Sequence, residues 1–298
     1  MSLSKLMDQP VFDDSVKKQE CHKYFPQTKS FDYNDTVEIA ISQQDVFMAF
    51  SESCLELECE ITPDAAAGEG TCELTNNVGA FLFSNMTYEL NNHVIETVRE
   101  PGLVSTLRSF ALLTPNESKA LSLAGWTPDT PVIQKDGRFF LSIPLSFLFS
   151  VFYDFRTPII GKHVFRLTRA ANDSNCYQSI KRAEGVATEG TKKATIHIHS
   201  MALSAMHIHP NDSIRLKIMS QVEKQSPFVI SFRKWDFMEN PNVARSTQDL
   251  WTVKTLSGLE RPRFIIVALQ TDIRNSFTKN ATYLSHNKIT KYESLPEL

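Results

Sequence analysis

Apolar and polar residues alternate with a period of two along two early segments of the chain. Residues 36–42 (TVEIAIS) and 54–62 (CLELECEIT) follow this pattern, so that Leu55 and Ile61 share one face of the second segment. A strand of this kind places one face on a core and the other in water. The alternation therefore predicts two half-buried strands.

A hairpin and a helix are predicted in the next part of the chain. Residues 86–98 surround Asn91 and Asn92, and asparagine tolerates the positive φ of a two-residue turn. Residues 101–113 begin with a Pro-Gly pair, carry apolar side chains at helical spacing and precede a Thr-Pro pair. We expect a hairpin followed by a surface helix of about three turns.

The later part of the chain is also rich in predicted strands. The candidates cover residues 195–209, with a break in the middle, 227–237, 249–255 and 263–271. Isoleucine and valine recur every four residues across 214–222, which predicts one helix between the strands.

These elements predict an all-β fold of two tandem jelly-roll β-sandwiches with short helices. Strands come in consecutive sets and do not alternate with helices, which argues against βαβ units. Residues 1–30 are polar and aperiodic, so we expect a mobile amino-terminal arm. The polar stretch before residue 193 is the best candidate boundary. We therefore expect the first jelly roll over 31–185 and the second over 186–298.

The composition is that of a folded, sheet-rich protein. The 298 residues are 42% hydrophobic and 22% charged, and 20 phenylalanines against 10 glycines suit packed sheets. A net charge of −3 gives no attraction to phosphate, so we expect no direct sequence-specific contact with nucleic acid. No stretch resembles a signal peptide or reaches the roughly 20 apolar residues of a membrane span. We expect an intracellular, soluble protein with no membrane span.

Half of the eight histidines form two His-x-His pairs, His197 with His199 and His207 with His209. Residues two apart share a face of a strand, so each pair has a geometry that permits chelation. A zinc or iron site needs three or more ligands, and the glutamate that follows His-x-His in cupins is missing after the first pair. We interpret the four histidines as alternating strand residues with a wet face. A cupin-like metal-binding jelly roll remains the alternative.

Other chemical signatures are missing from the sequence. The five cysteines contain no C-x-x-C, and none of the motifs G-x-S-x-G, G-x-x-x-x-G-K-[ST] and G-x-G-x-x-G occurs. We therefore expect no cofactor and no enzymatic activity. Trp126, Trp235 and Trp251 would stack on sugar if exposed, which keeps a carbohydrate-binding jelly roll as a second alternative, although a buried tryptophan is the commoner case.

Several stretches match a known family in order and spacing over residues 20–290. They are residues 74–92, 99–102 (REPG), 115–119 (PNESK), 124–126 (AGW), 143–154 (IPLSFLFSVFYD), 165–169 (FRLTR), 231–235 (SFRKW), 250–255 (LWTVKT) and 262–271 (PRFIIVALQT). The chain resembles the double jelly-roll-like proteins of arthropod genomes, which look like the major capsid proteins of Polinton and adintovirus-type elements.

The resemblance implies a structural, self-assembling capsid-like protein without an active site. It implies two eight-stranded jelly rolls side by side in one chain, and three chains in a pseudo-hexagonal capsomer. The expected partner is the protein itself, as a homotrimer and in higher capsid assembly, with a location in the virion if the element is viral. The subunit contacts that we expect are Tyr24, Phe25, Phe147, Phe149 and Phe152.

The end of the sequence departs from the family pattern. Family members continue past the stretch that matches residues 287–290 into a closing strand and a tail, whereas here residues 291–298 follow and the sequence ends. We therefore expect the second jelly roll to be truncated, without its last strand, and the neighbouring strand to be an exposed edge. A domesticated or degraded endogenous viral copy is one interpretation of this departure.

Overall fold

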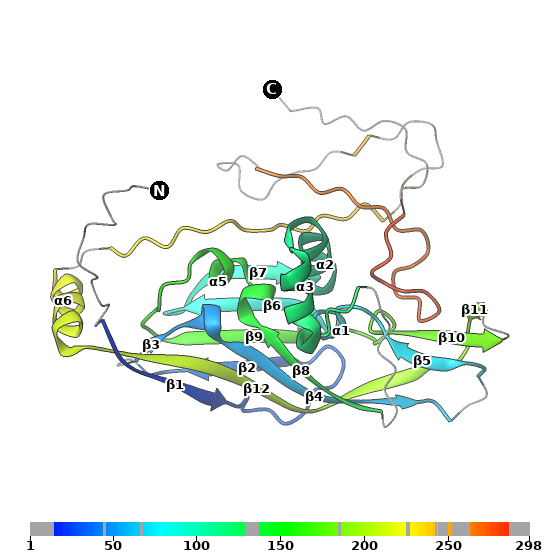
Figure 1. Ribbon diagram of the computed structural model, residues 1–298, viewed down its shortest axis with the longest axis horizontal. Coiled ribbons are helices and arrows are strands. Elements are labelled where there is room, and N and C mark those ends of the chain that lie inside the picture. Colours follow the sequence, from blue (N-terminus) through cyan, green and yellow to red (C-terminus); the bar gives the residue numbers. More distant parts are fainter. Residues whose placement is uncertain are drawn as a thin grey trace.

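The strands in the described part of the chain form two main sheets and one small sheet (Figure 1). The structure is a computed structural model that describes residues 15–43, 46–65, 68–128, 137–183, 186–224, 227–241, 243, 250–251 and 263–285. The first sheet has the order β1 (Val16–Tyr24), β12 (Ala194–Pro210), β4 (Cys54–Pro63) and β8 (Arg138–Pro144), with the short β3 (Phe47–Met48) also on β12. The second sheet has the order β2 (Thr36–Ile41), β9 (His163–Arg169), β6 (Phe83–Leu90) and β7 (His93–Arg99).

Eight strands of the two main sheets, all except β3, pair as a nested hairpin. Counted along the chain, the first pairs with the eighth (β1 with β12), the second with the seventh (β2 with β9), the third with the sixth (β4 with β8) and the fourth with the fifth (β6 with β7), all antiparallel. Rolling up such a hairpin places alternate pairs in two facing sheets, which is the topology of a jelly roll. An eight-stranded jelly roll therefore spans residues 16–210, and the predicted all-β class is confirmed.

Short helices and a small sheet are inserted between the jelly-roll strands. The small sheet has the order β11 (Val186–Glu189), β10 (Tyr177–Ala183) and β5 (Thr71–Leu74). The helices are α1 (Val78–Phe81), α2 (Pro101–Leu112), α3 (Pro115–Ala120), α4 (Leu145–Leu148), α5 (Ser150–Asp154) and α6 (Asp212–Glu223), with 3₁₀ turns η2 (Phe50–Glu52) and η3 (Leu121–Ala124). Among the described residues, none of the helices combines the length and the apolar composition that crossing a bilayer requires.

Three local predictions are confirmed. The hairpin forms between β6 and β7, and its two turn residues Asn91 and Asn92 have φ values of 50° and 66°. The expected helices form as α2 and α6. These segments carry strong local signals, because the turn asparagines and the helical spacing act within a few residues.

The core lies between the two main sheets and is rich in aromatic side chains. Phe50, Tyr88, Phe149, Phe152 and Phe165 are each at most 2% exposed. Their rings contact one another in edge-to-face, tilted and stacked pairs, with centroids 4.8 to 6.4 Å apart. Aromatic pairs at these separations add to the stabilisation that burial already provides. Most of the apolar stretch 139–153 therefore belongs to this core, although Phe140 is 56% exposed.

The predicted mobile arm contains a strand. Residues 16–24 of the expected arm 1–30 form β1, which pairs along β12 at the edge of the first sheet. Most of its side chains are exposed, so the sequence lacks the alternation that would have indicated a strand. This part of the expected arm is an edge strand of the jelly roll.

The predicted boundary near residue 185 falls inside the jelly roll. The strand that follows it, β12, lies between β1 and β4, so the first unit continues to residue 210. The polar stretch that suggested a boundary contains the hairpin of β10 and β11. Polarity there reflects a solvent-exposed hairpin and not a linker between domains.

Two predicted strands after α6 are extended without a ladder. Residues 227–237 and 263–270 are described, and the structure assigns them no strand partner within the described part of the chain. The predicted strand 249–255 lies outside the described residues except for Leu250 and Trp251. Both segments have an apolar, strand-forming composition, but within the described residues neither is paired with a sheet edge.

Candidate assembly surface

The four histidines of the His-x-His pairs lie along one continuous strand, β12. His197 and His199 are exposed near its start, whereas His207 is buried and His209 half-buried near its end. The register with β4 shifts at His199, which makes this residue part of a β-bulge. The strand continues through the bulge from Ala194 to Pro210, so the predicted break in the middle of the segment does not form. The histidines are strand residues as predicted, but the wet face holds only for the first pair.

Each histidine pair has separate partners. His199 Nε2 lies 2.7 Å from the Glu60 carboxylate on β4. His207 Nε2 lies 2.8 Å from the Tyr24 hydroxyl, and its ring stacks on that of His22 with centroids 4.2 Å apart. In the part of the chain that the structure describes, no three His, Cys, Asp or Glu side chains gather as metal ligands do. The pairs do not converge, so the geometry gives the cupin-like alternative no support.

Three of the five predicted subunit contacts are part of the chain's own core. Phe147, Phe149 and Phe152 lie on or beside α4 and α5 and are 5%, 0% and 1% exposed. The Phe152 ring lies with its centroid 5.1 Å from that of Phe50 and 4.8 Å from that of Tyr88. The prediction of an interface is wrong for these three residues. An apolar run has the same appearance in a sequence whether it faces a core or a neighbouring chain.

The other two predicted contacts lie at the end of β1. Tyr24 is half-buried, packs against the core and bonds to His207, so most of its ring serves the jelly roll itself. Phe25 is 65% exposed and presents its ring to solvent. Of this pair, Phe25 has the exposure that a subunit contact requires.

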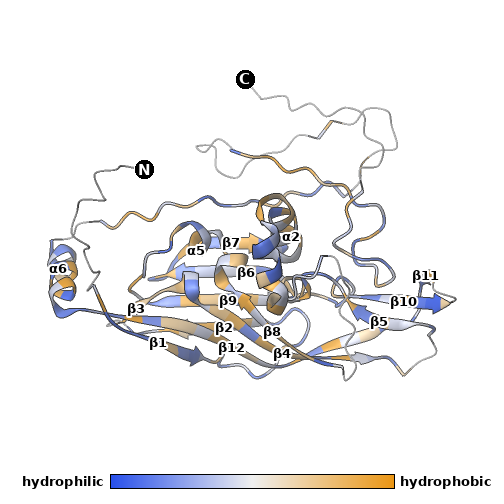
Figure 2. Ribbon diagram, in the orientation of Figure 1, coloured by the Kyte–Doolittle hydropathy of each residue, from blue (hydrophilic) through white to orange (hydrophobic). Residues whose placement is uncertain are grey.

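Among the described residues, the longest run of exposed apolar side chains lies in the late part of the chain. Residues 264–267 (FIIV), which we call the apolar segment, are 62%, 64%, 38% and 47% exposed in that order. Figure 2 shows their hydrophobic colouring along an extended stretch outside the main sheets. Four consecutive exposed apolar residues with high strand propensity are typical of a surface that pairs with another chain.

Two anchors hold the late residues on the jelly roll. Arg233 donates from Nε and Nη2 to the carboxylate of Asp154 at 3.0 and 2.6 Å, and this cation lowers the pKa of Asp154. Further along, the Phe277 carbonyl accepts a hydrogen bond of 2.7 Å from Ser179 N, and its ring stacks on that of Tyr177. The apolar segment lies between these two anchors in the sequence.

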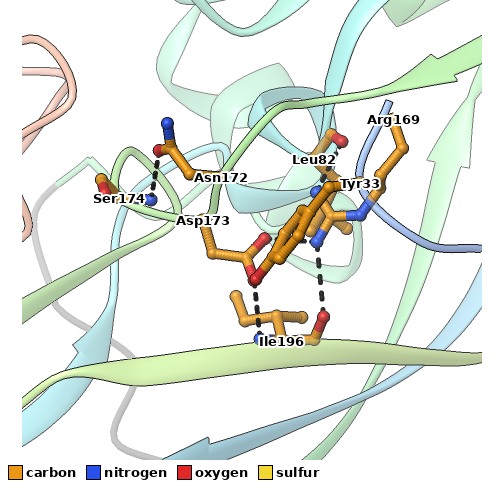
Figure 3. Close-up of polar contacts among 7 residues, drawn as sticks. All are labelled: Tyr33, Leu82, Arg169, Asn172, Asp173, Ser174 and Ile196. Carbon is orange, nitrogen blue, oxygen red and sulfur yellow. Dashed lines mark hydrogen bonds and ion pairs between the residues drawn. The ribbon is translucent and has the colours of Figure 1, made fainter. Parts of the chain in front are cut away.

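A buried charged cluster joins the two main sheets (Figure 3). Arg169, the last residue of β9, forms an ion pair with Asp173 and donates to the carbonyls of Leu82 at 2.8 Å and of Ile196 at 3.3 Å. Asp173 accepts hydrogen bonds from the Tyr33 hydroxyl at 2.7 Å and from Ile196 N at 2.8 Å. The cluster therefore connects the end of β9 in the second sheet with β12 in the first.

The sequence reasoning missed this cluster, although one signal for it exists. Arg169 has the same phase along β9 as the buried Phe165 and Leu167, so the alternation directs its side chain into the core. A buried arginine requires a counter-charge, and Asp173 is the next acidic residue in the chain. Burial and the neighbouring Asp173 carboxylate also raise the pKa of Tyr33, which keeps its hydroxyl a donor.

The tryptophans considered for sugar binding have different environments. Trp126 is 2% exposed, and its indole Nε1 donates to Ser118 Oγ at 2.9 Å. Trp235 is half-buried, and Trp251 is 42% exposed. Trp126 is thus a core residue, which removes one of the three aromatics on which the carbohydrate-binding alternative depended.

The described geometry is that of a jelly-roll β-sandwich with an exposed apolar strand-like segment. The chain belongs to the double jelly roll-like domain family, whose model matches residues 72–294. No curated protein matches the chain in sequence.

Several solved structures are similar to part of the chain. A crystal structure of PBCV-1 VP54 fitted into the virophage Sputnik matches with 12% identity and a TM-score of 0.44, over 70% of this chain and 46% of that one. The Faustovirus major capsid protein matches with 12% identity and a TM-score of 0.45, over 73% and 58%. A cryo-EM structure of the Sputnik virophage matches with 9% identity and a TM-score of 0.46, over 69% and 50%. The chain spans about half the length of these proteins.

Proposed function

We propose that the protein is a structural, capsid-like protein that assembles with copies of itself and has no catalytic role. Membership of the double jelly roll-like domain family supports this proposal, since jelly rolls are a common architecture of viral capsid proteins. The observation that carries it is the exposed apolar segment, residues 264–267. A second copy that covers these side chains would remove them from water.

The proposal includes three finer statements from the sequence resemblance. The assembly unit is a homotrimer, the particle is a virion if the element is viral, and the origin is a Polinton or adintovirus-related element. A domesticated or degraded endogenous copy belongs to the same proposal. These statements rest on the resemblance of the stretches described above and on no contact within a single chain.

The closed symmetry of such a unit explains why the apolar segment would matter. In a threefold ring each contact joins two different surfaces, and the ring closes without free ends. An extended segment with unpaired backbone groups supplies one of these surfaces by adding to a neighbouring sheet edge. The edges of the first sheet, β1 and β8, are available for such pairing in the described structure.

The test is the molar mass of the full chain by size-exclusion chromatography with light scattering. We expect three times the 33.8 kDa of one chain for the unaltered protein. Ile265→Asp introduces a charge at a residue that is 64% exposed, so it should leave the monomer folded but prevent assembly. Val94→Asp, at an equally open position on β7 with 59% exposure, is the matched control and should keep the trimer. A monomeric unaltered chain, or the same mass for both variants, would contradict the proposal.

A further inference from the structure

A surface pocket is lined by residues of α2, α3 and α4, together with Tyr153 of α5. Its volume is about 210 Å³, and most of its wall is apolar, including Leu112, Leu113 and Leu121. Its floor contains the guanidinium of Arg108, a residue that is only 6% exposed. An apolar pocket with one buried cation has the composition of a small-molecule site.

Arg108 is only partly satisfied by the protein. Its Nη2 donates to the carbonyls of Ser146, at 3.3 Å, and of Phe147. The structure provides no acceptor among the described residues for its Nε or Nη1. An arginine fork carries five N–H donors, so two carbonyl acceptors do not use all of them. Because Arg108 lines the pocket, its remaining donors can bind an acceptor that enters from outside the chain.

The neighbouring carboxylates are already engaged by other groups. Glu96 accepts hydrogen bonds from Ser150 N at 3.0 Å and from Val151 N at 2.9 Å. Asp154 is bonded by Arg233. Both act on Arg108 only through space, while burial lowers the pKa of its guanidinium. The charge of Arg108 consequently has no direct carboxylate partner among the described residues.

We propose that this pocket binds a small carboxylate with an apolar chain, whose two oxygens accept hydrogen bonds from Arg108. The planar guanidinium matches a carboxylate in a bidentate geometry, which is the strongest form of this contact. The Phe147 and Tyr153 rings, with centroids 6.0 and 5.7 Å from the guanidinium carbon, and the leucine side chains surround the apolar chain.

The volume limits the length of the ligand. An apolar cavity of about 150 Å³ holds benzene, so a pocket of this size has room for a carboxylate of roughly six to eight carbons. Glu117 also lines the pocket, but its carboxylate accepts from Thr114 N and Thr114 Oγ1 at 2.9 and 2.8 Å. The Glu117 carboxylate is held at the amino-terminal cap of α3. Its negative charge disfavours a ligand that carries a second negative group near this end of the pocket.

The first experiment titrates the full chain with sodium octanoate by calorimetry, with octanol as the uncharged comparison. We expect octanoate to bind at least about tenfold more tightly than octanol, because a charge-assisted pair with Arg108 is lost with the alcohol. Equal affinities, or no heat of binding for octanoate, would overturn the proposal.

Two variants on α3 locate the site without altering Arg108. Ala120→Trp places a ring in the pocket from an exposed position and should weaken octanoate binding by about tenfold or more. Asn116→Trp, exposed on the same helix but outside the pocket lining, should bind octanoate like the unaltered chain. Equal loss or equal retention in both variants would show that octanoate binds elsewhere. Both substitutions are at the surface, so folding is expected to be retained, and circular dichroism checks it.

Discussion

The buried ion pair between Arg169 and Asp173 yields a quantitative prediction for stability. Asp173→Asn keeps the size of the side chain but removes its charge, which leaves the guanidinium of Arg169, 1% exposed, without a counter-charge. Removing one partner of a buried ion pair typically costs about 3–5 kcal/mol. We expect Asp173→Asn to lower the free energy of unfolding by about that amount.

The hydrogen bonds of the cluster support the size of this effect. The Asp173 carboxylate accepts from Arg169, from the Tyr33 hydroxyl and from Ile196 N, and an asparagine offers one oxygen in place of two. At least one buried donor would lose its acceptor, at a cost of about 1–3 kcal/mol. This cost is part of the ion-pair figure and not an addition to it, because contacts within one network are not additive.

Urea unfolding followed by tryptophan fluorescence measures the change. Glu69→Gln is the matched control, because the Lys181–Glu69 pair has side chains 48% and 73% exposed and should leave the midpoint unchanged. Arg169→Met combined with Asp173→Leu removes both charges and should recover part of the loss, since apolar replacements of buried pairs are often neutral. A loss below about 1 kcal/mol for Asp173→Asn, or a double variant as unstable as the single one, would refute the reasoning.

Two further predictions concern stability. Burial lowers the pKa of His207 to about 4 from an ordinary 6.5. Between these two pH values the unfolded chain binds a proton at this residue that the folded chain does not bind. The free energy of unfolding therefore falls as the pH drops from 6.5 to about 4. His207→Gln should make this fall shallower in urea unfolding at pH 4.5 and 7, and an unchanged fall would assign the effect to other groups. Gly102→Ala places a methyl group on the ring of Phe81 in the contact between α1 and α2, so it should cost about 1–3 kcal/mol even though alanine favours helices. A raised urea midpoint for Gly102→Ala would mean that the ring moves aside freely.

The elements that the sequence predicted well are those with local signals. The strands over 36–42 and 54–62 show period-two alternation, and they form β2 and β4. Asn91 and Asn92 set the turn of the hairpin through their own backbone preference. In each case the signal depends on residues that are close together in the sequence.

The features that the sequence left undetermined depend on distant partners. β1 became a strand because β12 offers it an edge, and its own exposed side chains gave no alternation. The residues Phe147, Phe149 and Phe152 are apolar in either role, so only the fold decides that they face the core and not another subunit. For the same reason the pairing of Arg169 with Tyr33 and Ile196 required three-dimensional information, since these residues come from three separate parts of the chain.

The completeness of the jelly roll determines where assembly contacts should be sought. Its eight strands pair with one another over residues 16–210, and Phe147, Phe149 and Phe152, which the sequence placed at the subunit contact, lie in its interior. These three side chains are therefore not free to contact a neighbour. Among the described residues, the longest run of exposed apolar side chains is 264–267, beyond the last strand of the sandwich. If copies of this chain assemble through apolar contacts, these residues have the exposure and the strand-forming composition to provide them, whereas the core phenylalanines would first have to leave the sandwich.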